Sequence, residues 1–257
     1  MSDFLARINA NPPQWAGETI GAWDDSRLRL HGGFLKRHYR ADAGSINVFC
    51  IKGTAHSDYQ GLTWHEFLHR GKRMDRNIPM LERNPGYYFE TSVKKPSLYY
   101  TSYDGIDWYI DGDGNHRSVL ARFLFHEHGA VWLHGVRLNH YEFDEPLLAV
   151  YLALMEELPL HRPLGLYAET GIRHLHLSRV DNPGWKTDTF SSSLYFHFPS
   201  VDVSGELLSH PLVEWLRWPG GVESPVDGWK LLHELRAWRT GHAFRSSRPG
   251  IFSRLFR

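Results

Sequence analysis

The chain has 257 residues, and its 29 basic and 29 acidic side chains leave no formal net charge. A hydrophobic share of 42% and an aromatic share of 14% predict a packed globular core and exclude a disordered chain. The balanced charge excludes a surface that is basic all over, as in a general nucleic-acid coat protein, but it permits local basic patches.

The single cysteine, Cys50, excludes an intrachain disulfide and a cysteine-based zinc site. The first residues lack the apolar core of a signal peptide, and no apolar run reaches the ~20 residues that span a bilayer. We therefore expect a cytoplasmic protein without an integral membrane segment, able to lie at the periphery of a membrane-bound secretion complex.

The first quarter of the chain carries few regular patterns before one well-marked helix. Residues 1–45 predict an irregular lead-in with short strands, and residues 45–52 predict a strand rich in β-branched and aromatic side chains. Residues 62–70 have helical spacing. Thr63 is the expected N-cap, and Glu66 completes a capping box. A basic loop is expected at 70–76.

The clearest local pattern lies in the middle of the chain. Residues 97–103 and 106–110 predict two strands joined by the turn Asp104-Gly105, because glycine readily takes the positive φ of a tight hairpin turn. A helix is predicted at 118–125. Further on, we expect strands at 131–143 and 171–180, a helix at 147–158 that ends before Pro159, and short helices at 212–218 and 229–238.

A glycine-rich turn, Asp-Gly-Asp-Gly-Asn-His-Arg at 111–117, stands between the hairpin and the helix at 118–125. Gly112 and Gly114 let the backbone approach a ligand closely. The first N–H groups of the following helix have no internal partner, and the helix dipole favours an anion there. The turn therefore predicts a phosphate site.

Side chains of the turn suit the same chemistry. Arg117 offers a planar set of donors that matches phosphate oxygens, and His116 can transfer a proton near neutral pH. Asp111 and Asp113 carry the carboxylates that Mg²⁺ prefers. The alternative is structural, namely that Asp113 or Asn115 caps the helix.

The string Asp113-Gly-Asn-His-Arg117 resembles the phosphate turn of the ParB/sulfiredoxin-fold superfamily. Members carry Gly-Cys-His-Arg, Gly-Glu-Arg-Arg or Asp-Gly-His-His-Arg between a strand and a helix. The resemblance covers residues 60–128 and implies an α+β fold, a mixed sheet with flanking helices and a C-terminal extension. The resemblance also implies ATP or another nucleotide at the turn, with Mg²⁺. We expect a ParB/sulfiredoxin-like domain at 1–180 and an extension packed on the core at 181–245. The Ser-Ser-Arg-Pro-Gly segment that begins at 246 predicts a flexible basic tail at 246–257.

Two departures narrow the resemblance. Asn115 stands where sulfiredoxins have their cysteine, so sulfinic-acid reduction is not expected, and no helix-turn-helix module follows the turn. The chain is most similar to plasmid fertility-inhibition proteins of the Osa and FiwA type. That similarity implies a block of DNA transfer through a type IV secretion system, with ATPase and DNase activity at the turn and a conjugation component as partner.

The expected site follows from the turn and from this resemblance. Catalysis is expected of Asp113, His116 and Arg117, and Mg²⁺ binding of Asp111 and Asp113. Nucleotide binding is expected of Gly112, Gly114, Asn115, Arg117, Ser118, Lys72 and Arg73. DNA contacts are expected of Lys72, Arg73 and Arg76, although these side chains equally fit an exposed charged loop.

Two functional alternatives and two further side-chain groups stay open. The chain can be a nucleotide-binding inhibitor that docks without catalysis, or a small-molecule kinase of the free-serine kinase type. The histidine pairs at 126 and 128 and at 174 and 176 fit ordinary polar faces better than a metal site. The aromatic residues at 87–89 and 99–100 fit core packing better than stacking on bases of single-stranded DNA.

Overall fold

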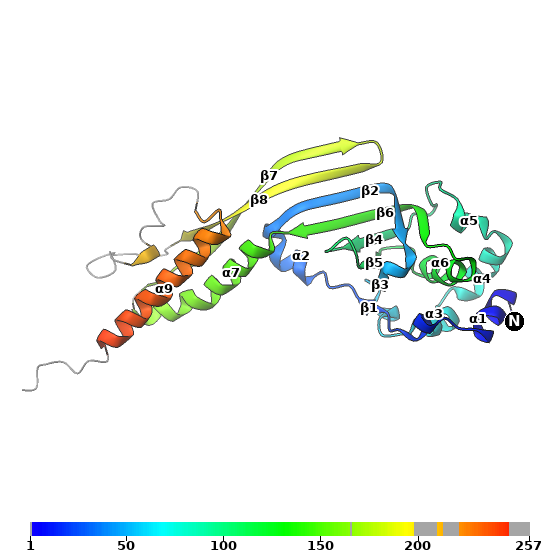
Figure 1. Cartoon of the computed structure of the whole chain (residues 1–257), viewed down its shortest axis with the longest axis horizontal. Helices are drawn as coiled ribbons and strands as arrows, with labels where there is room; N and C mark the ends of the chain where they lie inside the picture. The colour runs from blue at the N-terminus through cyan, green and yellow to red at the C-terminus, as the bar shows by residue number, and fades with distance from the viewer. Residues whose placement is uncertain (1, 165, 198–209, 213–220, 247–257) are drawn as a thin grey trace, which may run out of the picture. The chain divides into compact units, whose positions relative to one another are not determined.

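The computed structural model describes residues 2–164, 166–197, 210–212 and 221–246 (Figure 1). These residues form helices and an eight-stranded sheet with the strand order β1-β3-β5-β4-β6-β2-β8-β7. Parallel and antiparallel pairs both occur, which confirms an α+β protein with a mixed sheet. No helix among the described residues is both long enough and apolar enough to cross a membrane.

The chain divides into two compact units. Unit 1 comprises residues 1–30, 37–142 and 177–189, and unit 2 comprises residues 31–36, 143–176 and 190–257. The predicted phosphate turn lies in unit 1.

The sheet of unit 1 is built around the expected hairpin. Strand β3 pairs in parallel with both β1 and β5, β4 is antiparallel to β5, and β6 is parallel to β4. Farther along, β2 and β8 pair in antiparallel register from Arg37↔Thr189 to Ala41↔Trp185. The strands are β1 (Gly21–Ala22), β2 (Leu35–Asn47), β3 (Ile51–Thr54), β4 (Tyr99–Ser102), β5 (Trp108–Asp111), β6 (Trp132–Phe143), β7 (Glu169–Asn182) and β8 (Trp185–His197).

Helix α6 is the centre of the unit 1 core. Every residue from 118 to 125 is buried, and the apolar ones join a single cluster with Tyr100, Ile110 and Leu138 of the sheet. A helix that is apolar on all sides must be covered on all sides. The other helices of unit 1 are α1 (Asp3–Ala10), most of α2 (Ser26–His31), α3 (Trp64–Arg70), α4 (Met74–Arg83) and α5 (Gly86–Phe89), with α6 at Asn115–His128.

One charged side chain of α6 is held inside this core. The Arg122 guanidinium carbon lies 4.4 Å from the Trp15 ring centre and 4.3 Å from that of Trp64, and Nη1 donates to the Ile51 carbonyl at 2.6 Å. Burial lowers the pKa of Arg122 to about 10, against the opposing effect of the Glu18 carboxylate. The side chain stays charged at neutral pH and ties α6 to β3.

The best-marked sequence patterns are confirmed. Helix α3 begins with the Thr63–Glu66 capping box, with Thr63 Oγ1 accepting from the Glu66 N–H at 3.1 Å. The hairpin strands, α6, β6, α7 (Glu145–Glu157) and β7 all lie where their patterns place them. Helix α9 (Pro225–Ser246) contains the predicted short helix and extends it to 22 residues.

Other expectations were wrong. The lead-in at 1–45 contains α1 and most of the long strand β2, and the strand predicted at 45–52 is interrupted by a 3-10 turn at Val48–Cys50. The basic loop ends at Arg73, because α4 starts at Met74 and continues through Pro79. Burial of Met74, Ile78 and Leu81 offsets the backbone hydrogen bond that proline removes. Residues 213–218 and the tail after 246 lie outside the described residues.

In unit 2, helix α7 pairs with α9 through a buried carboxylate. Glu157 is 3% exposed, and it accepts from Arg239 Nε at 2.6 Å and from Arg236 Nε at 3.3 Å. The Arg and His donors lower the pKa of Glu157 in spite of its desolvation. Removal of either arginine would leave part of a buried charge without compensation.

A chain of hydrogen bonds reaches the same carboxylate from a distant segment. The Leu212 N–H donates to His210 Nδ1 at 3.2 Å, so a neutral His210 carries its proton on Nε2. That Nε2 lies 3.2 Å from His161 Nδ1, and His161 Nε2 lies 3.1 Å from Glu157 Oε1. Each neutral ring therefore accepts on Nδ1 and donates from Nε2. Burial lowers the pKa of His161, which keeps this arrangement at neutral pH.

Candidate functional site

The predicted turn leaves β5 and enters α6 through two glycines in positive-φ conformations. Gly112 has φ +56° and Gly114 has φ +121°. A Cβ on Gly114 would lie 3.3 Å from Leu98, so both conformation and space favour glycine there. The Tyr99 N–H donates to the Asp113 carbonyl at 3.2 Å and so fixes the turn to β4.

The N-terminus of α6 has no side-chain cap. Gly114 occupies the N-cap position, and no side chain of the described residues bonds the first amides of the helix. The Ser118 N–H is the first to bond within the helix, to the Gly114 carbonyl at 2.8 Å. The amides of Asn115, His116 and Arg117 therefore keep their donor capacity, and the helix dipole adds partial positive charge.

Two of the expected nucleotide-binding side chains lie beneath the turn. Asn115 is buried and its Oδ1 accepts from Thr54 Oγ1 at 2.6 Å. Ser118 is fully buried, and its Oγ donates to the Gly114 carbonyl at 2.8 Å and accepts from the Tyr100 hydroxyl at 2.7 Å. Their side chains position the turn, and of these two residues only Asn115 has a backbone N–H that is not bonded within the helix.

His116 is half-buried between aromatic rings. Its imidazole meets Tyr59 and Phe67 edge-on, at ring-centre distances of 5.5 and 5.4 Å. The Arg73 N–H donates to Nε2 at 3.3 Å, so the neutral ring carries its proton on Nδ1. Burial, followed by the positive charge of Arg73, lowers the pKa of His116. The neutral ring is thus a hydrogen-bond acceptor that joins α6 to the start of α4.

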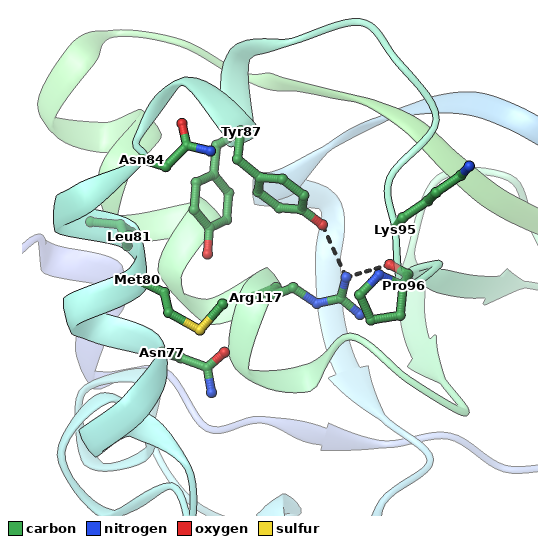
Figure 2. A pocket seen from close by; sticks show the side chains of 9 residues that line it. Asn77, Met80, Leu81, Asn84, Tyr87, Lys95, Pro96 and Arg117 are labelled. Atoms are coloured by element: carbon green, nitrogen blue, oxygen red, sulfur yellow. Dashed lines mark hydrogen bonds between the residues drawn. The ribbon is translucent and has the colours of Figure 1, made fainter.

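Arg117 is held by four acceptors. Its Nη1 donates to the Tyr87 hydroxyl at 2.9 Å and, by a shorter bond, to the Pro96 carbonyl (Figure 2). Its Nη2 donates to the Ser97 carbonyl and to Asp113 Oδ2, each at 3.1 Å. The expected open fork toward phosphate is therefore engaged with protein oxygens. Of the four acceptors, the Asp113 carboxylate is the exposed one, and another anion can take its place.

A pocket of about 190 Å³ adjoins Arg117. Figure 2 shows amide, tyrosine and lysine side chains around it. Its walls come from α4, α5, the segment before β4 and the first turn of α6, and consist of Asn77, Met80, Leu81, Asn84, Tyr87, Tyr88, Lys95, Pro96 and Arg117. The volume is below the roughly 300–1,000 Å³ of sites that enclose a whole drug-sized ligand, so it suits one ring of a larger ligand.

The three predicted basic residues differ in their environments. Lys72 pairs with the Asp58 carboxylate, which raises the pKa of the lysine. Arg73 is exposed at the N-cap of α4, one helical turn before Asn77 of the pocket. Arg76 is exposed in the first turn of α4. Within the described part of the chain, neither arginine side chain makes an ion pair.

The two carboxylates expected to share Mg²⁺ lie in different surroundings. Asp113 bonds Arg117, whereas Asp111, at the end of β5, lines a separate pocket with Trp23 and Tyr141. No group of three His, Cys, Asp or Glu side chains in the described ranges could hold a metal ion. Of the two carboxylates, only Asp113 lies beside Arg117 at the start of α6.

The other residues considered as site candidates, among the histidine pairs and the tyrosines, contact the protein's own backbone or lie in its core. His128 Nδ1 lies 2.9 Å from the Leu124 carbonyl, and His174 Nε2 lies 2.9 Å from the Leu35 carbonyl. Tyr100 is fully buried, which agrees with core packing. The pocket wall formed by α4 and α5 had no local signal in the sequence, because its residues meet only through tertiary packing.

We predict that His116 titrates below its ordinary pKa of 6.5. The unfolded chain then binds the proton more readily than the folded chain, so the stability that the neutral ring contributes is present above pH 6.5 and is lost as the pH falls through the folded pKa. Two-dimensional imidazole NMR checks the pKa and the Nδ1–H tautomer, with His116→Gln to assign the signal. A pKa at or above 6.5 contradicts this geometry.

No family model, no curated protein and no solved structure matches this chain. The α+β class and the mixed sheet rest on the structure itself. Membership of the ParB/sulfiredoxin superfamily stays a prediction from the turn at 113–117.

Proposed function

We propose that this chain is a nucleotide-binding protein whose phosphate site is the turn at 113–117. The observation that carries the proposal is the uncapped start of α6, next to the exposed Arg73 and a pocket that Arg117 lines. Free backbone donors, a helix dipole and a cation favour a phosphate group. A ring-sized pocket beside them favours a ligand that joins phosphate to a planar group.

In the proposed arrangement, the terminal phosphates meet the amides of residues 115–117 and the Arg73 guanidinium. The base or sugar enters the pocket, where Asn77 and Asn84 offer both donors and acceptors and Tyr87 offers a ring face. The incoming phosphate competes with the Asp113 carboxylate for Arg117. Because the phosphate takes the place of the Asp113 carboxylate, the Arg117 guanidinium keeps a negatively charged partner during the exchange.

The same geometry favours binding over rapid hydrolysis. Asp113 pairs with Arg117, whereas Asp111 lines a pocket with Trp23 and Tyr141, so the two expected magnesium ligands have different partners. Nε2 of His116 already accepts the Arg73 N–H, which occupies the atom that would act as a general base. We therefore infer a nucleotide-dependent docking protein, with ATPase or DNase activity as the second candidate that the family resemblance implies.

We expect Arg73→Ala to weaken ATP binding by about tenfold or more, because it removes a charge-assisted phosphate contact. Asp113→Asn should strengthen binding of metal-free ATP, since the competing carboxylate loses its charge. Calorimetry with and without Mg²⁺ measures both effects. If Asp113 instead holds the nucleotide's Mg²⁺, Asp113→Asn weakens binding in the presence of the metal.

The matched control is Arg83→Ala, in the last turn of the same helix, where Nε bonds only the Pro79 carbonyl of α4 itself. Arg83→Ala should leave ATP affinity unchanged. Equal loss in both arginine variants indicates a nonspecific charge effect. Unchanged affinity in Arg73→Ala removes Arg73 from the site.

For the biological role, we propose inhibition of conjugative DNA transfer, as the similarity of the turn to fertility-inhibition proteins implies. Production of the chain in a bacterial donor should lower transfer through a type IV secretion system. Mating frequencies measured for wild type and for Arg73→Ala test whether nucleotide binding is required, with Arg83→Ala as the control. Recovery of transfer with an abundant, folded variant supports nucleotide dependence, and unaffected transfer with the wild type across several systems refutes the role.

The double variant His116→Gln/Asp113→Asn separates hydrolysis from docking. If it abolishes ATP turnover while inhibition of transfer persists, docking suffices. If turnover and inhibition disappear together, hydrolysis is the mechanism. Transfer of the terminal phosphoryl group to an added small molecule, in place of water, would indicate the kinase alternative.

Contacts between DNA and the basic segment at 70–76 are tested by the salt dependence of DNA affinity. Each lost phosphate contact lowers the slope of log affinity against log salt by ~0.9 for duplex DNA. Neutralising Arg73 and Arg76 together should therefore flatten the slope by about 1.8, while Lys72→Ala changes it less because Lys72 is paired with Asp58. Fluorescence anisotropy over a salt series measures the slope. An unaltered slope in the folded double variant refutes the DNA assignment.

A further inference from the structure

A second pocket of unit 1, of about 390 Å³, opens on the face of the sheet away from α6. Side chains alternate along a strand, so Ile110 of β5 enters the core while Asp111 points to this other face. The pocket is lined by Trp23, Asp25, Leu28, Ala55, Thr101, Asp111 and Tyr141. Its volume lies within the roughly 300–1,000 Å³ range of small-molecule sites.

Two aromatic rings line this pocket, those of Trp23 and Tyr141, and neighbouring tyrosines contact them. Trp23 stacks on Tyr103 with ring centres 4.2 Å apart, and it meets Tyr109 at 5.3 Å. The Trp23 N–H donates to the Thr54 carbonyl at 3.0 Å, which fixes the backbone that presents the indole. Tyr141 lies on β6, 6.4 Å from Tyr103 between ring centres. The rings are thus held by one another and by the sheet.

The polar lining is acidic. Asp25 and Asp111 are the only charged side chains among the lining residues, and no described residue donates a hydrogen bond to the Asp111 carboxylate. Desolvation and then the negative charge of Asp111 raise the pKa of Tyr141, so the carboxylate lies close enough to the ring to influence its hydroxyl. Aromatic faces and carboxylate oxygens each attract a cation, so a pocket lined by both favours a cationic ligand.

Three arginines lie near the pocket, but none of them is among its lining residues. Arg29 reaches Asp25 at 3.8 Å, and both side chains are largely exposed. Arg27 lies over the Tyr103 ring at 5.3 Å, and neither residue is among the lining residues. Arg40 is bonded to an aspartate of β8 at 2.6 Å. No basic side chain lines the pocket itself.

We propose that this pocket binds a small organic cation, an alkylammonium or guanidinium group, with Trp23 and Tyr141 against its apolar surface and Asp111 and Asp25 as counter-ions. A metal ion fits less well, because the described lining offers two carboxylates and no third His, Cys, Asp or Glu ligand. The same chemistry occurs in a free polyamine and in a lysine or arginine side chain of a partner protein. The proposal is independent of the phosphate site.

Choline and its neutral isostere 3,3-dimethylbutan-1-ol test the charge requirement. Calorimetry and tryptophan fluorescence on the full chain should show choline and agmatine binding, with the neutral alcohol at least about tenfold weaker. Spermidine and N-acetylarginine methylamide separate the two sources, since the first represents a free amine and the second a side chain on a peptide backbone. Equal binding of choline and the alcohol, or no binding of any cation, overturns the proposal.

Two variants locate the binding. Trp23→Leu and Asp111→Asn should each weaken choline binding several-fold, whereas Trp132→Leu and Asp75→Asn, at exposed positions outside the pocket, should leave it unchanged. Asp25→Asn serves as a second carboxylate variant if circular dichroism shows that Asp111→Asn does not fold. Affinity that is unchanged in both Trp23→Leu and a folded carboxylate variant places the cation elsewhere and refutes the site.

Discussion

The burial of helix α6 on every side is the constraint on which the rest of unit 1 depends. A buried helix cannot rotate or slide without exposing apolar side chains, so its two ends are fixed in space by packing alone. Arg122, between two tryptophans and a β3 carbonyl, adds a directional contact to this packing. The first amides of α6 therefore emerge at one place, and the glycines at 112 and 114 are needed because the chain must turn sharply from β5 to reach it.

The same constraint explains why the turn is surrounded by interlocking polar contacts. The side chains of Asn115 and Ser118 are buried, and they bond Thr54, Tyr100 and the carbonyl of Gly114. Polar groups inside a core cost free energy unless they are paired, so a paired set holds one backbone conformation in preference to others. The precision of the candidate phosphate site comes from these buried groups more than from the residues that would touch the phosphate.

Local patterns were sufficient for the hairpin, α3, α6 and the turn, because capping boxes, Asp-Gly steps and glycine-rich loops act over a few residues. They failed for α4, where Pro79 hides a helix whose stability comes from buried Met74, Ile78 and Leu81. They also gave no sign of the protein partners of Arg117, because Tyr87 and the 96–97 carbonyls lie about 20 to 30 positions away in sequence. Such contacts depend on tertiary structure and leave no periodic signal.

The hydrogen-bond chain of unit 2 has a consequence for how this sequence can change over time. From Leu212 through His210 and His161 to Glu157, every link has a fixed donor and a fixed acceptor. A substitution at His210 removes the hydrogen-bond partner of the buried His161 Nδ1, so it costs free energy unless a compensating change occurs at the second position. The two histidines, 49 positions apart, are therefore expected to change together in evolution. Arg236 and Arg239 of α9 bond the same Glu157 carboxylate, so substitutions of these arginines are coupled to the histidines as well.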